Sequence, residues 1–149
     1  MPTFKSLSFA TTLIAAVFLV ACDDEGNPRQ IALQTNQAKW ETSNLAAYVF
    51  QYQRTSLFLS EGPIVISVVN EVVTSAFFTP SGVMVGPDEL AGLFTITNYF
   101  DLIQSAIDDD VHELRVTYDA TYGFPSNIFI DYDENAVDDT VQYFITEFQ

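Results

Sequence analysis

The strongest constraint on the fold is a set of short segments in which apolar and polar residues alternate. Residues 64–78 read IVISVVNEVVTSAFF, with a β-branched run on each side of Asn70 and Glu71. This pattern predicts a tight β-hairpin, because Asn tolerates the positive φ of a type I′ turn, although Glu71 stands where Gly is usual. Residues 48–53 alternate in the same way and predict another strand.

Three more strands are predicted over residues 112–118, 126–132 and 140–148. The side chains expected on the inner face of the first two are His112, Leu114, Val116, Tyr118, Ile128, Ile130 and Tyr132. For the last strand two inner faces remain open: either Val141, Tyr143 and Ile145, or Phe144 and Phe148. The connections are too short for parallel crossovers, so the pattern predicts an antiparallel sheet.

Helical periodicity is clearest over residues 95–110, where apolar residues recur every three or four positions and Thr95 or Thr97 can cap the start. Asp108 to Asp110 crowd its end, where negative charge is disfavoured. A short helix is expected over 37–46, and the Gly- and Pro-rich stretch 79–94 is expected to be a loop. The fold class predicted for residues 37–149 is therefore α+β: one domain, with an antiparallel sheet of about five to six strands and two helices packed on one face.

Composition excludes several classes of function. The chain of 149 residues has 20 Asp and Glu against 5 Lys and Arg, a formal net charge of −15. Such a surface repels the phosphates of nucleic acid, so no nucleic-acid partner is expected. A single cysteine, Cys22, excludes an internal disulfide, a thiolate zinc cluster and a Cys-x-x-Cys redox pair.

The first 21 residues resemble a targeting segment. Lys5 supplies a positive start, and the apolar run from Phe9 to Ala21 is shorter than the roughly 20 residues that span a bilayer. Residues 1–21 are therefore predicted to be a signal peptide. Residues 19–22, LVAC, match the bacterial lipobox, in which the cysteine is acylated and becomes the mature N-terminus. The alternative is an ordinary signal peptide followed by an incidental cysteine.

Acylation of Cys22 would fix the protein to a membrane, because two or three acyl chains bind far more firmly than one. Residues 22–36 are predicted to be the acylated cysteine and a flexible tether, since they lack periodicity and contain Gly26 and Pro28. The expected location is the bacterial cell envelope. Asp23 resembles the signal that retains lipoproteins in the inner membrane, which favours its periplasmic face over the outer membrane.

Most of the predicted mature chain resembles bacterial lipoproteins of the family catalogued as domain of unknown function 6174. The resemblance is carried by Trp40 with the aromatic strand after it, by GPIVISVVN, by FTITNYFDLIQSAID and above all by VTYDATYGFPSNIFIDYDENAVDD. One departure is that Leu57 and Leu59 stand where family members carry a Cys-x-Cys pair. The resemblance implies an exported, membrane-tethered single domain and implies no particular activity.

An acidic stretch, DYDENAVDD at 131–139, resembles a calcium-binding loop. The candidate ligands are Asp131, Asp133, Asn135 and Asp139. Two features of such a loop are missing, because Ala136 replaces the glycine of the sharp turn and Gln142 replaces the bidentate glutamate. The alternative is that these acidic residues are a solvated segment after a strand. No cofactor other than calcium is indicated by the sequence.

A second candidate site is the turn TYGFPS. Its residues Tyr122, Gly123, Phe124 and Pro125 are a candidate partner surface, because aromatic side chains anchor interfaces. The alternative is that the two aromatics close one end of the core.

His112 is the only histidine, and no Gly-x-Ser-x-Gly nucleophile motif is present. No catalytic residues are therefore assigned, and the chain is not expected to be an enzyme. The function predicted is a non-catalytic binding module, anchored to the membrane through Cys22, whose partner is an envelope protein or the cell wall. The alternatives are a cation-responsive acidic domain and a hydrolase with an unrecognised site.

Overall fold

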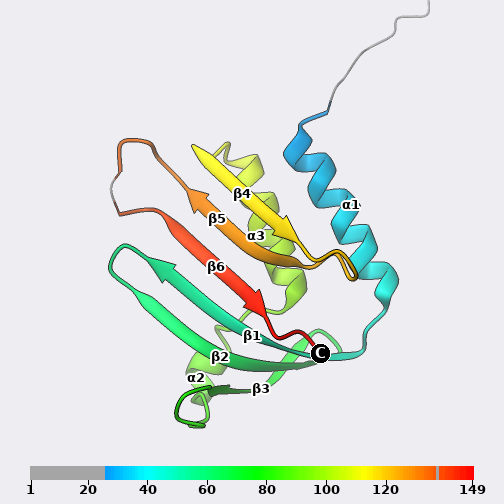
Figure 1. Ribbon diagram of the computed structural model, residues 1–149, viewed down its shortest axis with the longest axis vertical. Helices are drawn as coiled ribbons and strands as arrows, with labels where there is room; N and C mark the ends of the chain where they lie inside the picture. Colours follow the sequence, from blue (N-terminus) through cyan, green and yellow to red (C-terminus); the bar gives the residue numbers. More distant parts are fainter. Residues whose placement is uncertain (1–25, 137) are drawn as a thin grey trace, which may run out of the picture.

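One six-stranded antiparallel sheet organises the computed structural model, which describes residues 26–136 and 138–149 (Figure 1). The elements in chain order are α1 (Pro28–Ser43), β1 (Ala47–Ser56), β2 (Ser60–Val69), β3 (Val72–Phe78), α2 (Pro87–Leu90), α3 (Ile96–Asp108), β4 (Glu113–Tyr118), β5 (Pro125–Asp131) and β6 (Val141–Thr146). The predicted α+β class is confirmed. The predicted signal peptide, Cys22 and the first residues of the predicted tether lie outside the described residues.

The sheet consists of two three-stranded meanders that meet at β1 and β6, giving the order β3-β2-β1-β6-β5-β4. At the junction Tyr52 of β1 pairs with Ile145 of β6. β3 and β4 are consequently the two edge strands. Short connections make the four pairings within the meanders antiparallel, as predicted. The β1–β6 pairing between the meanders is antiparallel as well.

The two long helices pack on one face of the sheet. Trp40 of α1 meets Tyr48 of β1 edge to face with ring centroids 5.1 Å apart, and Phe50 meets Tyr99 of α3 at 6.5 Å. Phe50 and Tyr99 are almost completely buried. Large aromatic side chains therefore fill the layer between sheet and helices. None of the described helices is long and apolar enough to cross a membrane.

The first helix begins nine residues earlier than predicted, so a flexible tether reaching residue 36 is wrong from Pro28 onward. The side chain of Asn27 caps the helix by accepting a hydrogen bond from the Arg29 N–H at 3.0 Å. Pro28 occupies the first turn, where its missing N–H costs nothing. Leu33 is 1% exposed, so burial of this side chain also holds the segment in the domain.

The predicted hairpin at residues 64–78 and the predicted helix at residues 95–110 are both confirmed. Asn70 and Glu71 have φ of 49° and 60°, the left-handed pair of a type I′ turn. Glu71 accepts a hydrogen bond from Thr97 Oγ1 at 2.7 Å, which ties the unusual turn residue to α3. Thr95 caps α3 and forms a reciprocal capping box with Asn98.

Two side chains predicted to face the core do not. His112 is exposed and precedes β4, while Val111 is 5% exposed and takes the core position instead. Tyr132 follows the end of β5 and is 43% exposed. In both cases the predicted strand extends one residue beyond the observed strand at that end. The open question about β6 is also answered, because Val141 and Ile145 are buried.

Candidate functional site

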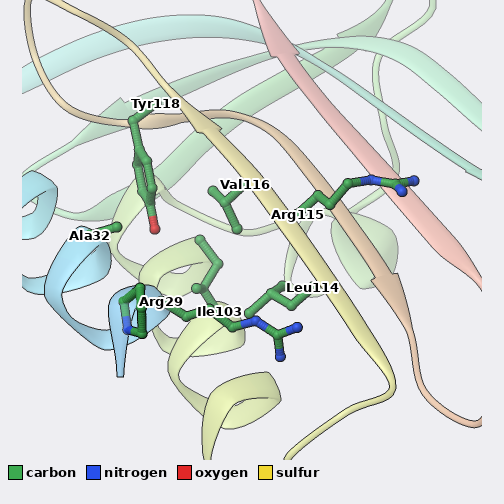
Figure 2. A pocket seen from close by; sticks show the side chains of 8 residues that line it. Arg29, Ala32, Ile103, Leu114, Arg115, Val116 and Tyr118 are labelled. Carbon is green, nitrogen blue, oxygen red and sulfur yellow. The ribbon is translucent and has the colours of Figure 1, made fainter. Parts of the chain in front are cut away.

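The principal candidate site is a groove of about 370 Å³ between α1, α3 and the edge strand β4, which we call the α1–β4 groove (Figure 2). The residues that line it are Pro28, Arg29, Ala32, Ile103, Leu114, Arg115, Val116 and Tyr118. Its size lies at the lower end of the range of about 300–1,000 Å³ typical of small-molecule sites.

The groove exists because α1 packs against α3 rather than against the edge strand. The side-chain amides of Gln30 and Gln104 exchange two hydrogen bonds of 2.8 and 3.0 Å between the helices. Near its other end α1 is held by a hydrogen bond from the Lys39 ammonium to the carbonyl of Ala120. The inner face of β4 is left partly uncovered as a result, with Val116 only half-buried.

The walls of the α1–β4 groove are apolar, with polar groups at few points. The Tyr118 hydroxyl points into the groove, and the Arg29 side chain runs below Ile103 towards Leu114 (Figure 2). Burial raises the pKa of Tyr118 to about 12, so its hydroxyl is a neutral donor and acceptor at physiological pH. This arrangement suits an apolar ligand that carries a few polar groups.

Arg115 of β4 contributes to the groove lining, but its guanidinium lies on the other face of the sheet. The guanidinium carbon lies 4.0 Å from the centre of the Phe129 ring, and Nη1 lies 2.5 Å from Glu113 Oε1. Arg29 is therefore the cationic side chain that lies along the groove (Figure 2).

The edge position of β4 adds a second mode of recognition. β5 pairs with one side of this strand, and in the described part of the chain no strand pairs with the other. An unpaired strand edge is a template for another extended chain. The α1–β4 groove thus places apolar side-chain space beside unpaired main-chain hydrogen-bonding groups.

The predicted partner surface at the TYGFPS turn is wrong for three of its four residues. Phe124 is 5% exposed and stacks on Phe148 with ring centroids 4.5 Å apart, and Pro125 is also buried. Gly123 has φ of 80°, and a Cβ there would lie 2.5 Å from the carbonyl oxygen of Asn36 in α1. These residues close one end of the core, which leaves Tyr122 as the exposed member of the set at 36%.

The calcium-loop candidates lie at one end of the sheet, where the β4–β5 pairing places Glu113 opposite Asp131. Asp133 Oδ1 accepts hydrogen bonds from the Asn135 N–H at 2.9 Å and from its side-chain amide at 3.1 Å. Asp139 Oδ2 accepts the Asp133 N–H at 2.7 Å. The Asn135 donors hold the pKa of Asp133 below its usual value. These carboxylates therefore serve to turn the chain.

The acidic loop and His112 do not form a metal centre. Within residues 26–136 and 138–149, no group of three or more His, Cys, Asp or Glu side chains is arranged to hold a metal ion. His112 is exposed and lies just before β4, and it makes a minor contribution to lowering the Asp133 pKa. Its backbone N–H donates to the Tyr132 carbonyl at 3.4 Å, an interaction that closes the strand end.

A family model matches most of the chain. Residues 32–149 match the model described as "Family of unknown function (DUF6174)", which covers well over half of the sequence. The chain belongs to the DUF6174 family. No curated protein and no solved structure matches the chain.

The α1–β4 groove of this DUF6174 domain was missed at the sequence level because residues 28–36 were assigned to the tether. A signal for α1 is nevertheless present. Asn27 followed by Pro28 is typical of a helix start, and Leu33 and Trp40 are separated by two helical turns. With α1 recognised, Arg29 and Ala32 fall on a helix that must pack somewhere.

Proposed function

We propose that this DUF6174 domain is a non-catalytic binding module, held in the bacterial cell envelope by acyl chains on Cys22, that binds an extended segment of an envelope protein in the α1–β4 groove. The lipobox at residues 19–22 supports the anchor. Pro28, where α1 begins, lies only six positions after Cys22. Six extended residues span about 20 Å, so the N-terminal end of the groove would lie close to the membrane surface.

The observation that carries the binding proposal is the position of the groove beside an edge strand. Leu114, Val116 and Tyr118 are alternate residues of β4, and all three line the groove. An extended segment that pairs with β4 would direct every second side chain towards this row. The main chain would supply affinity, while the size of the groove would select small or medium apolar side chains.

Charge indicates which segment fits best. The formal net charge of −15 favours a partner with a basic surface, because complementary charge steers association over a distance. It disfavours nucleic acid for the same reason. Within the groove, Arg29 disfavours basic residues at the apolar positions of the bound segment itself. Asp23 favours the periplasmic face of the inner membrane as the location.

Site-specific photocrosslinking in the native host tests the proposal. A photoreactive amino acid replaces Val116 in the groove, and the matched control replaces Thr74, an exposed residue on the other edge strand, β3. We expect one defined protein adduct from position 116 that is absent from position 74 and is lost when Ala32→Arg fills the groove. Equal adducts from both positions, or none from position 116, would refute the groove as the binding site.

A further inference from the structure

A second pocket, of about 170 Å³, lies where β1 and β2 meet β6 and the loop that leads into α3. Its lining residues are Tyr52, Arg54, Glu61, Gly92, Leu93, Phe94, Tyr99 and Tyr143, and we call it the tyrosine pocket. We propose that the tyrosine pocket is a binding site for one neutral sugar ring. This proposal does not depend on the function proposed for the α1–β4 groove.

Aromatic rings form the walls of the tyrosine pocket. Tyr99 lies at the centre, with ring centroids 5.4 Å from Phe94, 5.9 Å from Tyr143 and 6.3 Å from Tyr52. Phe94 is 38% exposed, so part of its ring is accessible to a ligand. A sugar ring has an apolar C–H face that packs on such rings, and its burial would remove exposed apolar surface from water.

The polar groups of the pocket are incompletely satisfied. Arg54 Nη1 lies 4.0 Å from Glu61 Oε2, too far for a hydrogen bond, and the Tyr52 hydroxyl reaches the same oxygen only at 3.5 Å. Arg54 Nε is buried and has no hydrogen-bond partner among the described residues. The Arg54 side chain as a whole is 35% exposed, so its terminal N–H groups, which lack a short contact to Glu61, are accessible donors for a ligand hydroxyl.

The three tyrosines add groups that both donate and accept. Burial raises the pKa of Tyr99 well above its usual value, and the neighbouring Tyr52 and Tyr143 add to that rise. Burial and the Glu61 charge likewise raise the pKa of Tyr52. Tyr52 and Tyr99 therefore stay protonated at neutral pH. With the Arg54 donors and the Glu61 acceptor, they match the alternating donors and acceptors of vicinal hydroxyls.

Charge favours a neutral ligand over an anion. Glu61 lies beside Arg54 and offsets part of its attraction for a carboxylate, and the chain as a whole carries −15. The size of the pocket limits the ligand to one ring. At about 170 Å³ it is smaller than sites for drug-sized ligands and accommodates a single ring, with the rest of a longer glycan outside.

An irregularity in the β1–β2 pairing positions Arg54 and Glu61. The β1–β2 register shifts between Tyr52 and Arg54. Gly62 has φ of 96°, and a Cβ there would lie 2.7 Å from the Tyr52 carbonyl oxygen. Only glycine therefore allows the two strands to approach closely beside Glu61.

Calorimetric titration of the full chain tests the proposal, in a detergent whose headgroup is not a sugar. The ligands are the methyl glycosides of glucose, galactose and N-acetylglucosamine, with glucuronate and acetate as anionic comparisons. We expect saturable binding of at least one neutral glycoside, with weaker binding of both anions. No binding of any neutral glycoside, or stronger binding of the anions, would overturn the proposal.

Substitutions tie the binding to the tyrosine pocket. Phe94→Ala and Arg54→Lys are expected to weaken sugar binding at least tenfold, and Tyr143→Phe to weaken it several-fold. The matched controls Arg115→Lys and Tyr122→Phe alter exposed residues outside the pocket and should leave binding unchanged. Because Tyr143→Phe removes only one hydroxyl, it keeps the test valid if another variant unfolds. Sugar binding that all three pocket variants retain would also overturn the proposal, whatever the outcome of crosslinking at Val116.

Discussion

Replacement of Leu33 by alanine tests whether α1 belongs to the folded domain. Leu33 is 1% exposed and is among the largest fully buried side chains, so its truncation leaves a cavity. Leu→Ala changes at such sites cost about 2–5 kcal/mol. The same change in a flexible tether would cost close to nothing. We therefore expect Leu33→Ala to lower the free energy of unfolding by about 2–5 kcal/mol.

Urea unfolding followed by circular dichroism measures this effect. The matched control is Ile31→Ala, since Ile31 lies in the same helix, has the same number of carbon atoms and is 53% exposed. We expect the control to stay within about 0.5 kcal/mol of the unchanged protein. The denaturant slope should be similar for all three proteins, because the surface exposed on unfolding is similar. If Leu33→Ala were no more destabilising than Ile31→Ala, the packing of α1 described above would be wrong.

Three further expectations concern the core, the acidic loop and pH. Gly123→Ala should destabilise the protein by more than Gly82→Ala in urea unfolding, because both have positive φ but only the Gly123 Cβ would collide with α1. Calcium titration by calorimetry should show no saturable binding, since Asp133 Oδ1 and Asp139 Oδ2 already accept hydrogen bonds within the loop and the described residues hold no cluster of three or more metal-binding side chains. Saturable binding lost in Asp133→Ala would contradict this. Burial raises the pKa of Tyr48 to about 12, so the unfolded chain releases this proton first and thermal stability should fall between about pH 10 and pH 12, whereas a flat profile would contradict the burial.

Local patterns in the sequence were sufficient to predict the sheet and α3. The hairpin at Asn70 and Glu71 depends on the φ preferences of two adjacent residues, and the capping of α3 depends on Thr95 and its near neighbours. Such features need no knowledge of the rest of the molecule. Strand ends were less predictable, because nothing in the alternation distinguishes Tyr132 after β5 from a residue within it.

The candidate sites depend on contacts between distant segments, which the sequence does not reveal. The α1–β4 groove brings Arg29 and Tyr118 together, and the tyrosine pocket brings Tyr52 and Tyr143 together. Burial of Phe124 depends on Phe148, 24 positions later, so an aromatic turn that resembles a contact surface closes the core instead. The start of α1 was missed for a different reason, since Asn27 and Pro28 are as typical of a loop as of a helix start.

Mass spectrometry of the N-terminal peptide, purified from the membrane fraction of the native host, tests the proposed anchor most directly. We expect a mature chain that begins at Cys22 and carries a diacylglyceryl group on its sulfur. We also expect Cys22→Ser to abolish this modification and to release the protein from the membrane. A chain with an unmodified Cys22 thiol that leaves the membrane fraction freely would refute the proposed anchor.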